Sequence, residues 1–165
     1  MAAPAIEPTN RYFNPAVTKI YFVPTIADQD APTRAELDAG TDLSNEIADI
    51  SGWQVTSGQI QTPDLGRRFT SSIPGRTTAE DSSITFYADR TGEDIRALLP
   101  RDTAGFIVIM DGGDVATQPM DVYPVRVASN GKMRSVGDEA ARIQVQFSIT
   151  SEPAEDVAIP AEDGA

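Results

Sequence analysis

Alternation of apolar and polar residues is the dominant pattern along the chain, and it predicts a protein built mainly from β-strands. A strand places successive side chains on opposite faces, so a half-buried strand shows an apolar residue at every second position. Residues 142–151 follow this period most clearly, with Ile143, Val145, Phe147 and Ile149 facing inward. Further strands are expected at 18–24, 82–88 and 120–128, and the apolar run 106–110 is expected to be a buried strand.

Helical signals are short and lie at two places. Thr33–Glu36 has the capping-box pattern that opens a helix, and Gly40 is placed to end it. Thr91–Asp94 repeats the pattern, and apolar positions 95, 98 and 99 then lie on one face of a helix that Pro100 ends. We expect this second helix to pack on a sheet.

A polar segment, residues 53–74, has the period of a strand but no apolar face. Pro63–Gly66 is a turn sequence, and a second strand is expected at 67–74. The segment is therefore predicted to be a long hairpin that needs some other surface to cover it. Trp53, at its start, is expected to be a half-buried packing residue.

These elements predict a mainly β fold, an antiparallel β-sandwich or barrel-like domain with one flanking α-helix and long loops. Residues 111–114 and 129–131 are expected to be turns between its strands. The domain is expected to span 17–151, after a proline-rich N-terminal arm at 1–16. Residues 152–165 have five acids and no base, and are expected to form an extended or disordered tail outside the core.

Composition narrows the possible functions. The chain has 25 acidic and 13 basic residues and a net charge of −12, which argues against binding nucleic acid or an anionic membrane by charge. It contains no cysteine and no histidine, which excludes thiolate metal sites and the commonest catalytic bases. A calcium loop at 111–114 would need more oxygen ligands, and a glycosidase would need an aromatic sugar platform. We therefore expect no enzyme activity, no cofactor and no metal.

The order of several short motifs resembles a known family. The motifs are 35–43, 50–53, 62–64, 73–75, 81–87, 94–99 and 122–127. Together they resemble the tail tube, or major tail, proteins of long-tailed bacteriophages that infect actinobacteria. The resemblance implies a structural protein of the virion tail, whose hexameric rings stack into a hollow tube through which genomic DNA leaves the capsid. It also implies tape-measure, tail-terminator and distal tail proteins as partners.

A non-enzymatic β-sandwich binding or decoration module of a virion is the alternative, and it would be monomeric or trimeric. If the chain forms a tube, the hairpin is a candidate for its wall, with Thr56, Gln59, Gln61 and Ser71 as lumen-lining candidates. Contacts between subunits are expected to join a basic cluster, Arg67, Arg68 and Arg76, to the acidic segment 28–49, through Asp38, Asp42 and Glu46. The two patches could instead pair within one molecule, and the hairpin face that meets the lumen is left open.

Overall fold

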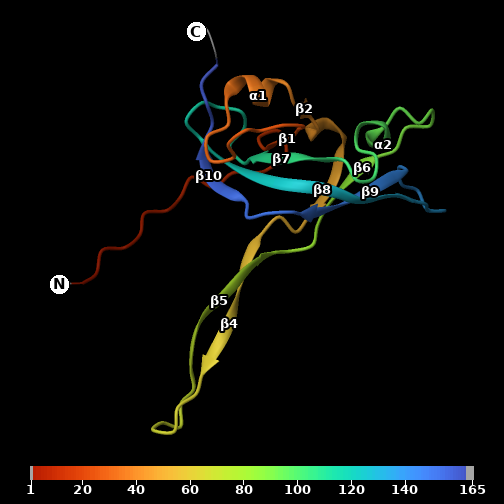
Figure 1. The fold of residues 1–165 in the computed structure, drawn as a ribbon. Helices are drawn as coiled ribbons and strands as arrows, with labels where there is room; N and C mark the ends of the chain where they lie inside the picture. The colour runs from red at the N-terminus through yellow and green to blue at the C-terminus, as the bar shows by residue number, and fades with distance from the viewer. Residues whose placement is uncertain (1, 163–165) are drawn as a thin grey trace.

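The structure is a computed structural model that describes residues 2–162 of the 165-residue chain. Over that range, one eight-stranded sheet forms the body and a two-stranded hairpin projects from it (Figure 1). The strands are β1 (Lys19–Val23), β2 (Thr41–Asp42), β3 (Ile47–Ser51), β4 (Val55–Thr62), β5 (Ser71–Ala79), β6 (Ser82–Tyr87), β7 (Ala104–Met110), β8 (Pro119–Met133), β9 (Arg142–Ile149) and β10 (Ala154–Ala158). The helices are α1 (Arg34–Asp38), α2 (Ile95–Leu98) and a short 3-10 helix, η1 (Ser44–Glu46).

The large sheet has the strand order β2-β1-β7-β8-β9-β6-β3, and its neighbouring strands are antiparallel. Its edge strands, β2 and β3, are joined along the chain only by the short η1 segment, so the sheet curls until its two edges approach each other. β8 is 15 residues long, and β10 and β9 follow one another along the same edge of it. The mainly β, antiparallel, barrel-like class predicted from the sequence is confirmed.

Two apolar clusters stabilise the body, and β7 lies between them. Ile107 and Ile109 point into the larger cluster, within the curl, together with side chains of β6 and β9. Val108 and Met110 point into the smaller cluster, which also contains Leu37 of α1. Because both faces of β7 are buried, its residues are apolar at every position from 106 to 110.

The second predicted helix is shorter than expected. α2 is a single turn, and its N-cap is Asp94, whose side chain accepts a hydrogen bond from the backbone of that turn. Thr91 does not cap the helix, because its amide and hydroxyl both donate to Asp89 in the preceding loop. The predicted capping box is therefore wrong, and α2 is not a substantial flanking helix. Its predicted apolar face is confirmed in part: Ile95 and Leu99 are buried in the larger cluster, but Leu98 is 38% exposed.

The turn predicted at residues 129–131 does not form. β8 continues through these residues, with a bulge in its pairing to β9 between Val127 and Ser129. Asn130 is buried, and its Nδ2 donates to the carbonyl oxygen of Leu99 at 3.1 Å. An amide that usually serves an exposed turn here satisfies a buried backbone acceptor at the end of α2.

The two ends of the chain differ. Residues 2–13 are exposed, contain no helix or strand, and run away from the body in Figure 1. The C-terminal segment, expected to lie outside the core, instead supplies β10 to the sheet and buries Ile159 in the smaller cluster. The expectation of a separate tail is therefore wrong for this segment, and residues 163–165 lie outside the described residues.

Candidate assembly surfaces

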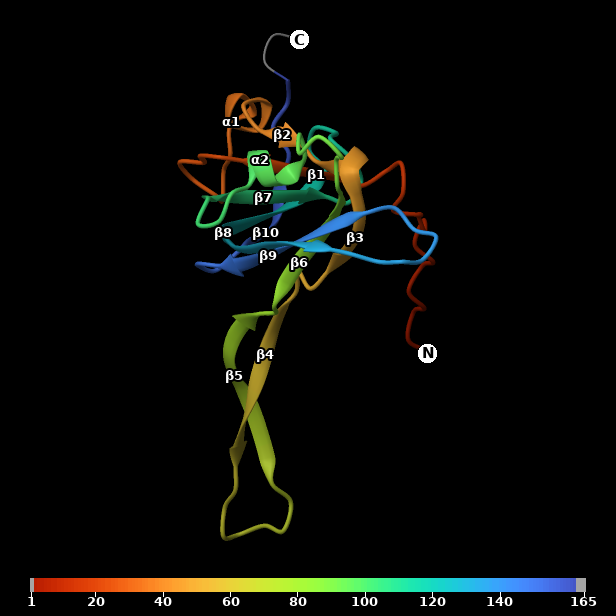
Figure 2. The same ribbon diagram turned by 90° about the vertical axis from the view of Figure 1, so that its right-hand side faces the viewer.

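The projecting hairpin is the element that the chain leaves uncovered. β4 and β5 pair from Val55 opposite Ala79 at the base to Thr62 opposite Ser71 near the tip. No residue of either strand is buried. Figures 1 and 2, at right angles to each other, both show it leaving the body as a narrow ribbon. An isolated two-stranded hairpin is only marginally stable in water, so we expect this arm to be stabilised by packing against the surface of another molecule.

The second strand of the hairpin lies later in the chain than predicted, because β5 begins at Ser71 and not at residue 67. Arg67 and Arg68 therefore lie in the loop at the tip, whereas Arg76 lies in the strand. Arg67 Nε is 3.6 Å from Asp64 Oδ2 within the same loop, and both side chains are exposed. Within residues 2–162, Arg68 and Arg76 form no ion pair, so both remain available for a contact between molecules.

The hairpin has two different faces, because directly opposed side chains share a face and neighbours along a strand alternate. The isoleucine face consists of Thr56, Ile60, Thr62, Ser71, Ile73 and Thr78. The glutamine face consists of Gln59, Gln61, Ser72 and Pro74, together with Val55, Ser57, Thr77 and Ala79 nearer the base. Side-chain hydrogen bonds agree with this division: the hydroxyls of Thr62 and Ser71 are 2.8 Å apart on one face. On the other face, Ser72 Oγ donates to Gln59 Oε1 at 3.1 Å.

The four lumen-lining candidates divide between these faces. Gln59 and Gln61 lie on the glutamine face, and Thr56 and Ser71 lie on the isoleucine face. One face of the hairpin therefore cannot present all four side chains to a lumen. Local sequence patterns do not separate them, because the division depends on the strand register and on the bulge between the two halves of the hairpin.

Ile60 and Ile73 are the candidates that the sequence analysis missed. They lie directly opposite each other, and each is 52% exposed. The two strands lie close together beside them: a Cβ at Gly75 would lie 3.3 Å from Ile60 Cγ1 and 3.2 Å from the Gly58 carbonyl oxygen. A signal was present, since the two isoleucines are equally far from the two ends of the loop 63–70. They are also the two isoleucines of the polar segment 53–74, and both lie in its paired strands.

Trp53 anchors the base of the hairpin in the body. Its ring is buried, not half-buried as expected, and packs edge-on against Tyr123 with the ring centres 5.2 Å apart. Its indole Nε1 donates to the Ser83 carbonyl oxygen at 3.2 Å, and its own carbonyl oxygen accepts from the Tyr123 hydroxyl at 2.7 Å. Burial raises the pKa of Tyr123 well above its ordinary value, so the hydroxyl keeps the proton that it donates.

The backbone at this base has little freedom. Gly52 has a φ of 84°, and a Cβ there would lie 2.4 Å from the Asp81 carbonyl oxygen, so only glycine fits. Trp53 also has a positive φ, 64°, and its amide donates to Ser82 Oγ at 3.0 Å. The hairpin therefore leaves the body from a fixed and tightly packed point.

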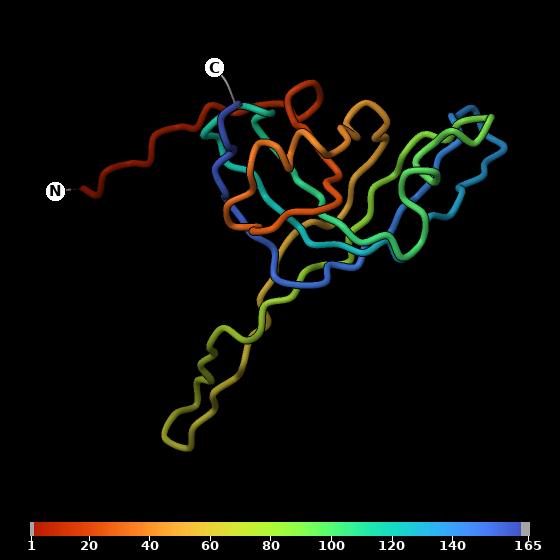
Figure 3. The backbone as a smooth tube through the Cα atoms, turned by 45° about the horizontal axis from the view of Figure 1, so that its top comes forward, coloured from red at the N-terminus to blue at the C-terminus, as the bar shows by residue number. Residues whose placement is uncertain are grey.

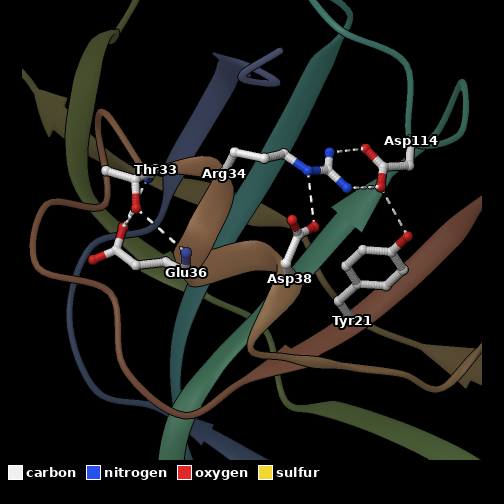
Figure 4. Close-up of polar contacts among 6 residues, drawn as sticks. All are labelled: Tyr21, Thr33, Arg34, Glu36, Asp38 and Asp114. Atoms are coloured by element: carbon white, nitrogen blue, oxygen red, sulfur yellow. Dashed lines mark hydrogen bonds and ion pairs between the residues drawn. The ribbon is translucent and has the colours of Figure 1, made fainter. Parts of the chain in front are cut away.

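The acidic segment 28–49 includes α1, β2 and η1, and these lie at the opposite end of the molecule from the hairpin tip (Figures 1 and 2). The capping box predicted there is confirmed. The Glu36 amide donates to Thr33 Oγ1 at 3.3 Å, and the Thr33 amide donates to Glu36 Oε2 at 2.8 Å (Figure 4). The bonds from the Thr33 and Ala27 amides lower the pKa of Glu36.

Arg34 joins α1 to the loop after β7 (Figure 4). Its Nη1 and Nη2 each donate to one carboxylate oxygen of Asp114 at 2.7 Å, and its Nε donates to Asp38 Oδ1 at 2.8 Å. The Tyr21 hydroxyl donates to Asp114 Oδ2 at 3.0 Å. The bonds from Arg34 hold the pKa of Asp114 below its ordinary value, and burial, with the bond to Asp114, raises the pKa of Tyr21 to about 12. Asp114 therefore acts as a structural acceptor in a connecting loop.

The acids expected to contact a neighbouring subunit are not equally available. Asp38 binds Arg34, and Asp42 Oδ2 lies 3.4 Å from Lys19 Nζ. Glu46 is exposed and forms no ion pair within residues 2–162. Over the same range, no ion pair joins the acidic segment to the basic hairpin tip, which lies at the other end of the molecule. The alternative in which the two patches pair within one molecule is therefore wrong.

Among the described residues, no group of three or more acidic side chains is arranged to hold a metal ion. No helix in residues 2–162 has the length and apolar character needed to span a membrane.

A β body with an uncovered strand pair, and with charges of opposite sign at its two ends, is typical of a structural protein that associates with other molecules. The chain matches the family model described as phage tail tube protein over residues 7–162, and it belongs to that family. It is therefore a structural, non-enzymatic component of the tube in the phage tail. This confirms the function predicted from the sequence and excludes the decoration module. The match identifies the protein family but does not identify the group of bacteria that the phage infects.

Solved structures share the fold at low sequence identity. A chain of the sheath–tube complex of the PVC extracellular contractile injection system has a TM-score of 0.60 and 9% identity, covering 90% of this chain and 95% of that one. A chain from the sheath/tube terminator of that system has a TM-score of 0.58 and 10% identity, and the match covers 89% of this chain and 99% of that one. A chain from the tube-terminating cap of the anti-feeding prophage has a TM-score of 0.57 and 15% identity, and the match covers 96% of this chain and 100% of that one. A comparison with curated protein sequences finds no match.

Proposed function

We propose that this chain forms closed hexameric rings that stack into the hollow tail tube, with the hairpin of each copy lying against neighbouring copies. The observation that carries the proposal is the hairpin itself, whose strands of eight and nine residues contain no buried residue. Assembly would supply the packing that the arm lacks and would cover free strand edges, which are otherwise prone to aggregation. The hexameric copy number follows from the family resemblance.

The charge distribution favours copies that stack head to tail. Arg67 and Arg68 are at the hairpin tip, and the acidic segment 28–49 is at the other end of the molecule. A contact between two different patches is heterologous, and it repeats along an axis without closing. Glu46 is the best acidic partner because it is exposed and forms no ion pair within residues 2–162. Arginine suits this contact, since its planar guanidinium can bind a carboxylate through two hydrogen bonds.

The glutamine face is the side of the hairpin that we propose for the lumen. Gln59 and Gln61 are polar and uncharged, and the chain as a whole carries a charge of −12. Such a wall offers little cationic surface to DNA, so the genome can pass without being held. Thr56 and Ser71 lie on the isoleucine face, which is better suited to a contact between subunits.

Partners are proposed from the resemblance and from related systems. Structures that share this fold come from a sheath–tube complex and from tube terminators. By analogy, the tube of this protein would meet a terminator at one end, and tape-measure and distal tail proteins would take part in its assembly. The same resemblance favours a long-tailed phage that infects actinobacteria as the source of the virion.

Electron microscopy of the purified, negatively stained protein tests the ring and the tube. We expect tubes of uniform diameter, and hexamers in sedimentation experiments at low protein concentration. Monomers or trimers at every concentration, with no rings or tubes, would contradict the proposal. Co-purification with the tape-measure and terminator proteins of the same phage tests the partners separately.

A further inference from the structure

The exposed isoleucine pair on the hairpin has no partner in its own chain. Ile60 and Ile73 oppose each other across the two strands, and about half of each remains in contact with water. Trp53 fixes the point from which the hairpin leaves, and Figure 3 shows the arm extending from the body as a separate lobe. Leaving such a pair in water forgoes the stabilisation that burial of aliphatic surface brings, so a surface that covers it is expected.

The body has a groove of matching character between the edge strand β3 and the first residues of β1, which lie beyond the pairing of β1 with β2. It encloses about 470 Å³, which is within the size range of sites that accept a whole small ligand. Four isoleucines, Ile20, Ile47, Ile50 and Ile109, line it. Of these, Ile50 is 43% exposed. The groove therefore combines an apolar floor with room for at least two aliphatic side chains.

The rim of the groove is acidic, and the hairpin carries the opposite charge beside its isoleucines. Asp49 and Asp111 belong to the groove, and its one cation, Lys19, lies close to Asp42. Burial and the nearby acids Asp121 and Asp156 raise the pKa of Asp111, so an added cation at this rim would be stabilising. On the hairpin, Arg76 lies three residues after Ile73, at the bulge in β5, and forms no ion pair within residues 2–162.

We propose that the isoleucine face of the hairpin in one copy packs into the β1–β3 groove of a neighbouring copy. This rests on the proposed assembly into a tube, and it adds which face of the arm makes the contact and which surface receives it. Apolar side chains meet an apolar floor, and Arg76 lies near the acidic rim. The glutamine face is then left in water. The contact joins two different patches, so each copy both gives an arm and receives one.

Engineered disulfides test the pairing directly, since the chain has no cysteine of its own. A chain carrying Ile73→Cys and Ile50→Cys should form a ladder of linked copies on a non-reducing gel after mild oxidation. A disulfide forms only when the two Cα atoms approach within roughly 4.4–6.8 Å, so the reaction reports the contact itself. The matched control, Ser72→Cys with Ile50→Cys, moves the thiol to the glutamine face and should form far fewer links.

A second pair of variants tests the energy of the contact. Ile60→Thr with Ile73→Thr keeps β-branched residues in the strands but removes aliphatic surface, and it should lower tube yield by roughly tenfold or more. Gln59→Thr with Gln61→Thr introduces two threonines on the other face without removing an isoleucine, and should leave the yield within about twofold of the unmodified protein. Circular dichroism melting of both variants should match the unmodified chain, because all four positions are exposed.

The outcomes separate this inference from the proposed function. If the threonine variant of the isoleucine face forms tubes as readily as the unmodified chain, or the two cysteine pairs link equally, the groove pairing is wrong while the tube stands. If the unmodified chain forms neither rings nor tubes, the proposed assembly fails, and the pairing fails with it.

Discussion

Arg34 and Asp114 form a salt bridge through two hydrogen bonds, each 2.7 Å long, between α1 and the loop that follows β7. The two side chains are only 10% and 17% exposed, so water screens the pair weakly. α1 has five residues, too few to be stable as an isolated helix. The salt bridge therefore holds α1, and with it the acidic end of the molecule, against the sheet.

Replacing Arg34 by methionine is expected to lower the free energy of unfolding by about 2–4 kcal/mol, because a largely buried carboxylate loses its cation. Urea denaturation followed by circular dichroism measures the change. Arg90→Met is the control, since Arg90 is exposed, and it should change the free energy by less than about 0.5 kcal/mol. Equal losses in the two variants would contradict the role given to Arg34.

The same salt bridge predicts a loss of stability in acid. Hydrogen bonds from Arg34 hold the pKa of Asp114 below its ordinary value of 3.8, so the unfolded state takes up a proton at higher pH than the native state. The stabilisation is present above the unfolded pKa and is lost as the pH falls through the native pKa. The stability difference between the unmodified protein and Asp114→Asn should therefore be large near about pH 7 and smaller near about pH 3. A difference that stays constant would show that the carboxylate charge is not what stabilises this loop.

Tyr123 and Trp53 predict a second stability effect, at the base of the hairpin. Tyr123→Phe removes the hydroxyl that donates to the Trp53 carbonyl oxygen at 2.7 Å, and leaves that buried acceptor without its bond. We expect a loss of about 1–2 kcal/mol in unfolding free energy. Tyr87→Phe is the matched control, because Tyr87 is 41% exposed, and it should have almost no effect. A negligible loss in Tyr123→Phe would mean that the ring packing alone anchors the arm.

Ile159 tests whether the C-terminal segment belongs to the core. It is 1% exposed, and Ile159→Ala should cost about 2–4 kcal/mol in thermal or urea unfolding. Ile6→Ala, at a position that is 95% exposed in the N-terminal arm, should leave the stability unchanged. Identical melting of the two variants would restore the sequence-based expectation that the end of the chain is dispensable.

The sequence predicted the strands because half-buried strands keep an apolar residue at every second position. In β9 and β6 the predicted inward residues Val145 and Ile84 are fully buried, and they are paired neighbours in the sheet. The C-terminal segment carried no such period, because β10 lies at one edge of β8 and most of its residues face solvent. Ile159, which this segment contributes to the core, gives no recognisable pattern because the residues around it are mostly acidic, alanine or proline.

The missing turn at residues 129–131 and the division of the hairpin into two faces are the remaining differences between the sequence-based predictions and the structure. Asn130 and Gly131 are typical of a turn, but a buried carbonyl at Leu99 gives the Asn130 amide a partner only in the folded protein. The faces of the hairpin depend on its register, and one extra residue in β5 between Thr77 and Pro74 sets which side chains share a face. Local sequence patterns do not contain that information, so the four lumen candidates could not be assigned to one side.

The separation of Arg67 from Glu46, at opposite ends of the molecule, makes the charge distribution testable in assembly. Arg67→Glu with Arg68→Glu should fold with unchanged stability, since both positions are exposed in the tip loop. It should also fail to form long tubes at low salt. The control, Arg90→Glu with Arg134→Glu, makes the same change in net charge at other exposed loops and should assemble normally.

Restoring the charge complementarity separates a specific contact from general repulsion. Glu46→Arg, added to the chain that carries Arg67→Glu and Arg68→Glu, should recover part of the tube yield, because the reversed tip then meets a cation at the other end. Glu46 is chosen over Asp38 and Asp42, whose cations lie in their own chain. Exposed ion pairs contribute only about 0.2–1 kcal/mol each, so several act together, and the effect should weaken as salt is added. If the variant with both tip arginines reversed assembles as readily as the unmodified protein at low salt, charge does not direct the stacking, and the apolar contact of the hairpin must carry it alone.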